Sequence, residues 1–327
     1  MSSFLLIVMI IVDVVLFSTL IGYVVKRLKA EKAGEEVSKS RVSKIMIFVG
    51  IILFVYALSL TMIMVWGFYN SLKDPLDYRI DMLGLPPTWK FSNYSTVLEF
   101  FYVLDKSVTP NRPVYILEMV LNSVLYAAGS SLLQATIQFI MAYVASRFAT
   151  RFGRIVYVIV IIGMTVPIVG SEPSALAIAE KLHLKDSILG MWLMKSYFLG
   201  MYFLIFFETL KAFPKDFSEA AHIDGASNTR VMWQIMFPLA RTTFFTIVLL
   251  LFVGFWNDYT TPMLFMPNVP TLSYGLWSFV MGNSINEIAN EPMRLAACLL
   301  LLLPILILFT FLHDKLLANV SVGCIKE

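Results

Sequence analysis

The chain alternates between long apolar runs and short polar segments. An apolar run of about 20 residues crosses the roughly 30 Å hydrocarbon core of a bilayer as a helix. Seven windows have that length and character, and they cover residues 4–25, 45–70, 119–145, 155–172, 188–211, 242–262 and 293–313. The pattern predicts an all-α integral membrane protein with about seven transmembrane helices.

Composition supports this class and excludes others. Of the 327 residues, 58% are hydrophobic and 14% are charged, and the net charge is only +3, which argues against a nucleic-acid partner. The two cysteines and three histidines are scattered along the chain. We therefore expect no disulfide framework and no metal site.

The basic residues predict the orientation of the chain, because short cytoplasmic loops hold an excess of lysine and arginine. Residues 26–44 contain seven basic side chains, and Arg147, Arg151 and Arg154 are unopposed by acids. Both loops are therefore expected inside, with residues 71–118 as an ordered outer loop. This arrangement places the N-terminus outside and the C-terminus in the cytoplasm.

Residues 219–238, "EAAHIDGASNTRVMWQIMFP", interrupt two very apolar windows with a polar stretch on the predicted cytoplasmic side. Asp216 followed by Glu219 has the spacing of a capping box, so a short helix is expected to begin there. Asp224-Gly225 is a turn signal, because glycine adopts the positive φ that ends a helix.

A second helix is predicted after the turn. Ser227 can cap this helix, which is expected to run to Pro238, and Pro238 suits the opening turn of the following span. The helix–turn–helix bracket would expose Phe217, Ala220 and Ala221 on one face, so docking to a partner would stabilise it.

Two surfaces could receive this bracket. An amphipathic helix lying on lipid headgroups is one possibility, but such helices usually carry several basic residues. Residues 216–229 contain three acids and no lysine or arginine. A protein partner is the interpretation that we favour.

At this segment the chain resembles the permease subunits of ATP-binding-cassette (ABC) importers, which carry an "EAA...G" loop within a context such as "PKDFSEAAHIDGAS". The stretches "LPPTWKFSNYSTVL" and "FVGFWNDYTTPMLF" extend the similarity, most closely to the shorter membrane subunit of maltose-like carbohydrate importers. The resemblance covers roughly residues 45–327. Residues 1–43, an additional helix and basic loop, depart from the six-span pattern, which leaves a permease domain over 44–327.

The resemblance implies that the loop at about 213–240 is a coupling helix that docks into a cytoplasmic ATPase. The residues carried over are Glu219, Ala220, Ala221, Asp224 and Gly225. It also implies a prokaryotic plasma membrane location, a companion permease in a heterodimer, an ATP-binding subunit dimer and an extracellular substrate-binding protein. Membrane lipid surrounds such a subunit.

The chain contains no G-x-x-x-x-G-K-[ST] phosphate loop, so we expect a transport subunit and not an enzyme. ATP and Mg would be bound by the partner ATPase, with no cofactor in this chain. The solute is a sugar or oligosaccharide by resemblance, and its identity is not readable from the sequence.

Polar residues inside predicted spans are candidates for a substrate path, because they are costly in a membrane. Trp256, Asn257, Asp258 and Tyr259 could stack on a sugar ring and bind its hydroxyls, or could belong to an interfacial aromatic belt. Lys195 lies within the fifth window. Gln134 and Gln138 lie one helical turn apart and therefore share a face of their helix. This face either lines the path or forms hydrogen bonds to a neighbouring helix.

Two other classes remain as alternatives. A secondary transporter would place ionisable residues and broken helices at mid-membrane, often with an internal repeat, and no convincing repeat is visible. A membrane-embedded sugar transferase would need a catalytic constellation, and the predicted outer loop contains none that we recognise. ATP hydrolysis that depends on partner proteins would distinguish the importer from both.

Overall fold

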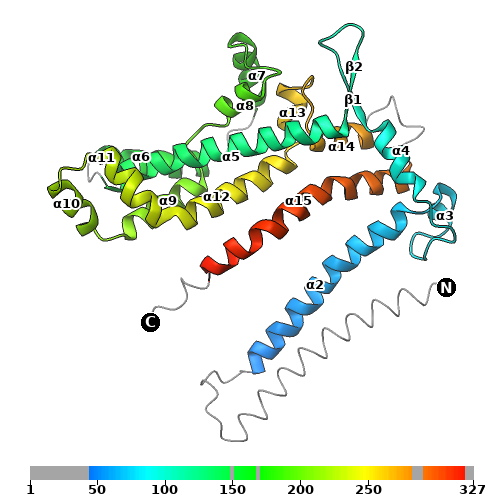
Figure 1. Ribbon diagram of the computed structural model, residues 1–327, viewed down its shortest axis with the longest axis horizontal. Helices are drawn as coiled ribbons and strands as arrows, with labels where there is room; N and C mark the ends of the chain where they lie inside the picture. Colours follow the sequence, from blue (N-terminus) through cyan, green and yellow to red (C-terminus); the bar gives the residue numbers. More distant parts are fainter. Residues whose placement is uncertain (1–43, 148–150, 167–169, 282–289, 321–327) are drawn as a thin grey trace, which may run out of the picture. The chain divides into compact units, whose positions relative to one another are not determined.

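The structure is a computed structural model whose described residues form helices and one short hairpin (Figure 1). It forms two compact units, one of residues 1–99 with 285–300 and the other of residues 100–284 with 301–327. The first predicted span, residues 4–25, lies outside the described part of the chain. The described residues are 44–147, 151–166, 170–281 and 290–320.

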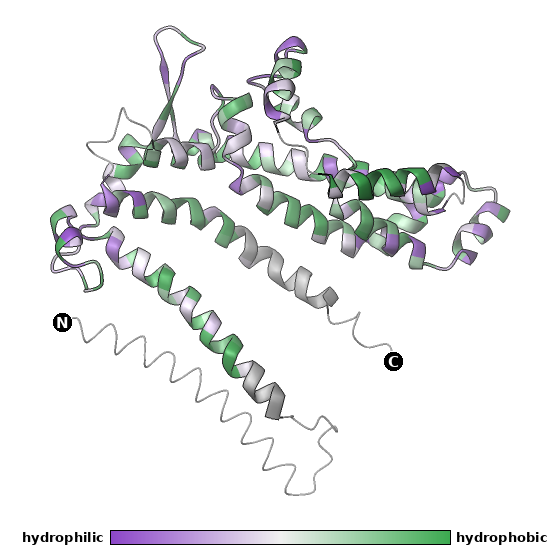
Figure 2. Ribbon diagram, turned by 180° about the vertical axis from the view of Figure 1, so that it is seen from behind, coloured by the Kyte–Doolittle hydropathy of each residue, from purple (hydrophilic) through white to green (hydrophobic). Residues whose placement is uncertain are grey.

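Long apolar helices confirm that the chain is a membrane protein. Three described helical stretches are long and apolar enough to span a bilayer, namely Gly50–Ser71, Ile116–Arg147 and Asn228–Asn257. Two shorter apolar stretches are Gly153–Thr165 and Leu272–Met281. Figure 2 shows hydrophobic colour along much of α12 (Phe237–Asn257), whereas hydrophilic colours are frequent on α10 (Asp216–Ile223).

The prediction of one continuous helix over residues 188–211 is wrong. The structure has α8 (Ile188–Met194) and α9 (Met201–Ala212), separated by the non-helical segment 195–200. Gly200 supports the break with a φ of 136°, a backbone conformation that L side chains rarely adopt. The segment itself is largely apolar, so hydropathy alone does not reveal the interruption.

The first unit contains α2 (Lys44–Ser71), α3 (Pro75–Ile80) and most of α4 (Ser92–Phe100). The segment after α2 is ordered, as predicted for this loop. Trp66 and Tyr69 donate hydrogen bonds from α2 to the carbonyls of Met82 and Leu83, at 2.9 and 2.8 Å. The loop is thereby held against the end of α2.

Asp81 makes the fold of this loop sensitive to acid. Its Oδ1 accepts hydrogen bonds from the amides of Leu83 and Gly84, at 2.9 and 2.8 Å, and these amides hold the carboxyl pKa below its ordinary value of 3.8. The stabilisation is therefore complete above that value and is lost as pH falls through the lowered pKa. We expect proteolytic cleavage at residues 81–91 to rise at the acidic end of a pH series, and Asp81→Asn to show the acid behaviour at neutral pH.

The second unit begins with a small β-hairpin, so the prediction of an all-α chain is wrong in this detail. Strands β1 (Tyr102–Asp105) and β2 (Arg112–Tyr115) pair antiparallel, with Tyr102 opposite Tyr115. Both strands lie within the polar stretch that was predicted to be an outer loop.

The centre of this unit is α5 (Ile116–Arg147), which packs against α8, α9, α12 and α14 (Leu272–Met281). Its Phe139 is fully buried and meets the rings of Phe206, Phe237 and Phe244 edge-on. Gly129 lets α8 approach closely, because a Cβ there would lie 1.9 Å from a Trp192 ring carbon. The other helices are α6 (Arg151–Thr165), α7 (Glu172–Lys181), α13 (Thr260–Phe265) and α15 (Glu291–Val320), the last crossing into the first unit.

Candidate functional site

The polar bracket between α9 and α12 forms as two helices and a glycine turn. Helix α10 ends at Ile223, and Gly225 follows with a φ of 80°. The Ser227 Oγ then accepts the Arg230 amide at 3.4 Å and caps α11 (Asn228–Val231). The predicted roles of Gly225 and Ser227 in the backbone are confirmed.

The predicted capping box at Asp216 is wrong. Asp216 is the first residue inside α10, and Lys215 occupies the cap position without a side-chain hydrogen bond. The amides of Ser218 and Glu219 instead reach the Lys215 carbonyl, at 2.8 and 3.0 Å. The spacing of acids is correct for a capping box, but the helix begins one residue earlier than that motif requires.

The segment after α11 also differs from the prediction of a separate second helix that stops at Pro238. A π-turn, η1 (Met232–Met236), joins α11 to α12, and the Phe237 amide bonds the Met232 carbonyl five residues back. Pro238 therefore lies in a helix that is continuous from Asn228 to Asn257. The widened turn fits a proline, which cannot donate to the carbonyl four residues before it.

The bracket presents a mixed surface. Glu219, Ala220, Asp224 and Gly225 are exposed, whereas Ala221 is 9% exposed, which corrects the expectation that it lies on the open face. The large apolar side chains that α10 exposes are Phe217 and Ile223. A short helix with apolar and acidic groups open to solvent has the character of a docking element.

Two side chains of α5 hold the ends of the bracket, and sequence reasoning missed this role. Arg147 Nη2 donates to the Phe213 carbonyl at 3.1 Å, where α9 ends. One helical turn earlier, the Tyr143 hydroxyl donates to the Asn228 carbonyl at 3.3 Å, where α11 begins. The sequence signal was the basic charge of Arg147, which we used only for orientation.

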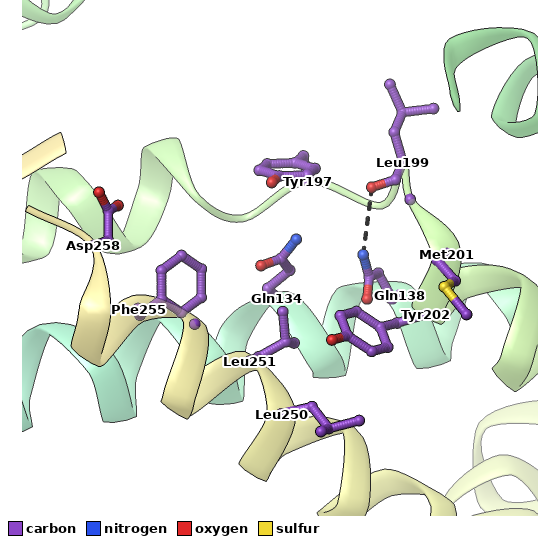
Figure 3. Close-up of a pocket in the computed structure, with 12 residues that line it drawn as sticks. Gln134, Gln138, Tyr197, Leu199, Met201, Tyr202, Leu250, Leu251, Phe255 and Asp258 are labelled. Carbon is purple, nitrogen blue, oxygen red and sulfur yellow. Dashed lines mark hydrogen bonds between the residues drawn. The ribbon is translucent and has the colours of Figure 1, made fainter. Parts of the chain in front are cut away.

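A cavity of about 350 Å³ lies between α5, α12 and the break before α9 (Figure 3). Gln134 and Gln138 of α5 line it together and are 3% and 0% exposed, which confirms that they share a face. Gln138 Nε2 donates to the Leu199 carbonyl at 3.4 Å. The non-helical backbone after α8 thus forms part of the wall.

Asp258 reaches one end of the cavity, and its carboxylate is held by three polar contacts. It accepts the Tyr126 hydroxyl and the Thr261 amide, each at 3.0 Å, and Lys195 Nζ lies 3.8 Å from its Oδ2. Lys195 also donates to Thr261 Oγ1 at 2.9 Å. These contacts connect the end of α8 to the end of α12, and sequence reasoning did not anticipate Tyr126 or Thr261.

Removing one member of this ion pair is expected to destabilise the protein more than removing both. Lys195→Met leaves the partly buried Asp258 carboxylate without its cation, at a cost on the order of 2 kcal/mol. The double variant Lys195→Met, Asp258→Asn should recover most of the lost thermal stability, as measured by the unfolding temperature in detergent. Equal losses in both variants would show that the pair does not interact.

The other aromatic candidates do not line the cavity. Trp256 is buried and stacks on Phe252, with centroids 5.9 Å apart. Tyr259 is exposed and stacks on Trp277, and Asn257 bonds the Val253 carbonyl of its own helix. The structure therefore brings together Gln134, Gln138, Asp258 and Lys195, and separates Trp256, Asn257 and Tyr259 from them. No cluster of metal-ligating side chains occurs among the described residues.

Residues 116–322, more than half of the chain, match the family "Binding-protein-dependent transport system inner membrane component". The chain belongs to this family. The permease is thus a transport subunit and not an enzyme, and it is a multi-pass membrane protein. Membership implies an ATPase and a substrate-binding protein as partners.

Individual relatives of the permease match over most of its length. It is 26% identical over 79% of its length to the probable starch degradation products transport system permease protein AmyC of Thermoanaerobacterium thermosulfurigenes, covering 89% of that protein. It is 24% identical over 80% of its length to the diacetylchitobiose uptake system permease protein NgcG of Streptomyces coelicolor, covering 83% of that protein.

A solved structure shares the fold of the permease. It is a bacterial ABC transporter involved in the import of the acidic polysaccharide alginate, and it aligns with a TM-score of 0.66 at 21% identity. The alignment covers 85% of the permease and 99% of that chain. These comparisons give no support to a secondary transporter.

Proposed function

We propose that the permease passes a sugar or oligosaccharide across the membrane and is driven through the α10 bracket by a separate ATPase. The observation that carries the proposal is the exposed surface of Glu219, Ala220, Asp224 and Gly225, with the bracket pinned at both ends to α5. Ala221 supports this surface from its buried side. A helix fixed in this way can transmit a movement of a docked partner to α5.

The sugar assignment rests on the relatives, which are named for starch products and diacetylchitobiose. Within the permease, the proposed path residues are Gln134, Gln138 and Asp258, which line the cavity, and Lys195, which pairs with Asp258 from outside the lining. Trp256, Asn257 and Tyr259 take supporting positions near the end of α12, outside the lining of the cavity.

We further propose the arrangement of the whole subunit. Seven spans place the N-terminus outside and the C-terminus in the cytoplasm, so that the α10 bracket faces the ATPase. Residues 1–43 supply an additional span, and residues 44–327 form the permease domain. A companion permease completes a heterodimer, with the ATPase dimer below it and the substrate-binding protein on the outer side.

Purification from native membranes in mild detergent tests this proposal. We expect a protein with a phosphate loop and a second multi-span protein to co-elute, as identified by mass spectrometry. The reconstituted complex should hydrolyse ATP, and sugar uptake should depend on that hydrolysis. A chain that elutes alone and transports along an ion gradient would contradict the proposal.

A further inference from the structure

The cavity contains two hydrogen-bond acceptors that the described part of the protein leaves unused. Gln134 Oε1 and Gln138 Oε1 are buried and have no partner among the described residues, and both side chains line the cavity. A buried amide oxygen without a partner costs roughly 1–3 kcal/mol, so a molecule in the cavity that donates a hydrogen bond to either oxygen would remove that cost. Hydroxyl groups are donors of this kind.

The remaining walls suit the apolar faces of a ring. Tyr197, Tyr202 and Phe255 line the cavity together with Leu250 and Leu251 (Figure 3). Aromatic faces pack against the C–H faces of sugar rings, while a few polar groups fix the orientation of the hydroxyls. The cavity therefore combines acceptors for hydroxyls with surfaces for ring carbons.

The charges around the cavity exclude an anion. Among the described residues that line it, Asp258 alone is charged, and its carboxylate is balanced by Lys195 at 3.8 Å. Lys195 is itself occupied with Thr261 and lies outside the lining. A carboxylate or phosphate entering the cavity would lose water, gain no cation and approach Asp258.

We infer that this cavity is a site for a neutral, hydroxyl-rich ligand and that it discriminates against acidic sugars and sugar phosphates. The inference rests on the proposed function and adds the charge class of the ligand. The shared fold does not fix this property, because the structural neighbour belongs to an importer of an acidic polysaccharide.

Thiol-reactive probes of different charge test the inference without knowledge of the natural ligand. Gly254 lines the cavity, and a Cβ added there meets no atom within 4 Å, so Gly254→Cys is a suitable reporter. It is introduced into the full chain carrying Cys298→Ser and Cys324→Ser, in its native membrane complex. Asn111→Cys, on the exposed end of the hairpin, is the matched control.

The measured quantity is the ratio of reaction rates for a neutral hydroxyethyl and an anionic sulfonatoethyl methanethiosulfonate. We expect this ratio to be at least about tenfold larger at Gly254→Cys than at Asn111→Cys, which corresponds to about 1.4 kcal/mol against the anion. Adding Asp258→Asn removes the carboxylate and leaves the Lys195 cation unpaired. The rate ratio at Gly254→Cys should then fall toward the ratio at Asn111→Cys. If Gly254→Cys does not assemble, Gln134→Cys reports from the opposite wall.

Equal ratios at the two cysteines would overturn the inference, as would a cavity ratio that Asp258→Asn leaves unchanged. In the reconstituted importer, a neutral trisaccharide should be taken up in preference to the same trisaccharide oxidised to its carboxylate. Loss of ATP dependence in that uptake would contradict the proposed function, whereas the reagent ratios test the cavity alone.

Discussion

Replacing Gly225 with proline is expected to reduce transport at least about tenfold while the protein stays inserted in the membrane, because a loss of roughly 1.4 kcal/mol in docking suffices. Proline fixes φ near −65°, whereas Gly225 has a φ of 80°. Proline would also remove the hydrogen bond from the Gly225 amide to the His222 carbonyl, at 3.0 Å. The angle between α10 and α11 would change, whereas Gly225 itself lies before the apolar stretch Asn228–Asn257.

The matched control is Gly225→Asn, because asparagine tolerates a positive φ better than other L residues. We expect this variant to retain most of the transport activity. Glu219→Lys provides a second test, since it reverses an exposed charge on α10 without altering the backbone. Uptake into proteoliposomes and protein abundance in membranes are measured together, and normal uptake by both Gly225→Pro and Glu219→Lys would disprove the coupling role.

Arg147→Ala is expected to uncouple ATP hydrolysis from transport. The variant removes the donor to the Phe213 carbonyl and the contact to Met236 Sδ at 3.4 Å, so one end of the bracket is released from α5. A hydrogen bond from a charged group contributes about 1.5–3 kcal/mol, and partial exposure of Arg147 places it at the lower end. We expect sugar transported per ATP to fall roughly tenfold, in line with that energy.

The control for this variant is Arg154→Ala, which removes an exposed basic charge from the same loop region. If Arg147 acted only through its positive charge on the membrane orientation of the chain, both variants would have similar effects. If Arg147 couples the bracket to α5, only Arg147→Ala would lower the sugar transported per ATP. Arg147→Lys should restore part of the ratio, because an ammonium can still donate to a carbonyl. A parallel fall of ATP hydrolysis and transport in Arg147→Ala would indicate a merely structural role.

Local signals were sufficient to predict the turn between α10 and α11 and the cap of α11. Gly225 and Ser227 act through their own φ angle and hydroxyl, so their roles do not depend on distant parts of the chain. The start of α10 was missed because Asp216 and Glu219 have the spacing of a capping box, whereas Lys215 occupies the cap position. Arg147 holds the Phe213 carbonyl just before this start, and the motif does not contain that tertiary contact.

The cavity was predicted less completely, since it depends on tertiary contacts. The i, i+4 spacing of Gln134 and Gln138 identified their common face. The break after Met194 was missed, because residues 195–200 keep the composition of a membrane helix and are stabilised by contacts from α5 and α13. Trp256 illustrates the opposite case, in which an aromatic residue beside polar neighbours packs against Phe252 and away from the cavity.

The π-turn before α12 determines which side of α12 faces α5. Each residue of an α-helix turns about 100°, so the additional residue in η1 rotates everything after it by that amount relative to α11. A deletion of one residue within Met232–Met236 would restore a regular helix and shorten the chain very little. It would nevertheless swing Gly254, Phe255 and Asp258 away from Gln134 and Gln138, and the two walls of the cavity would no longer face each other.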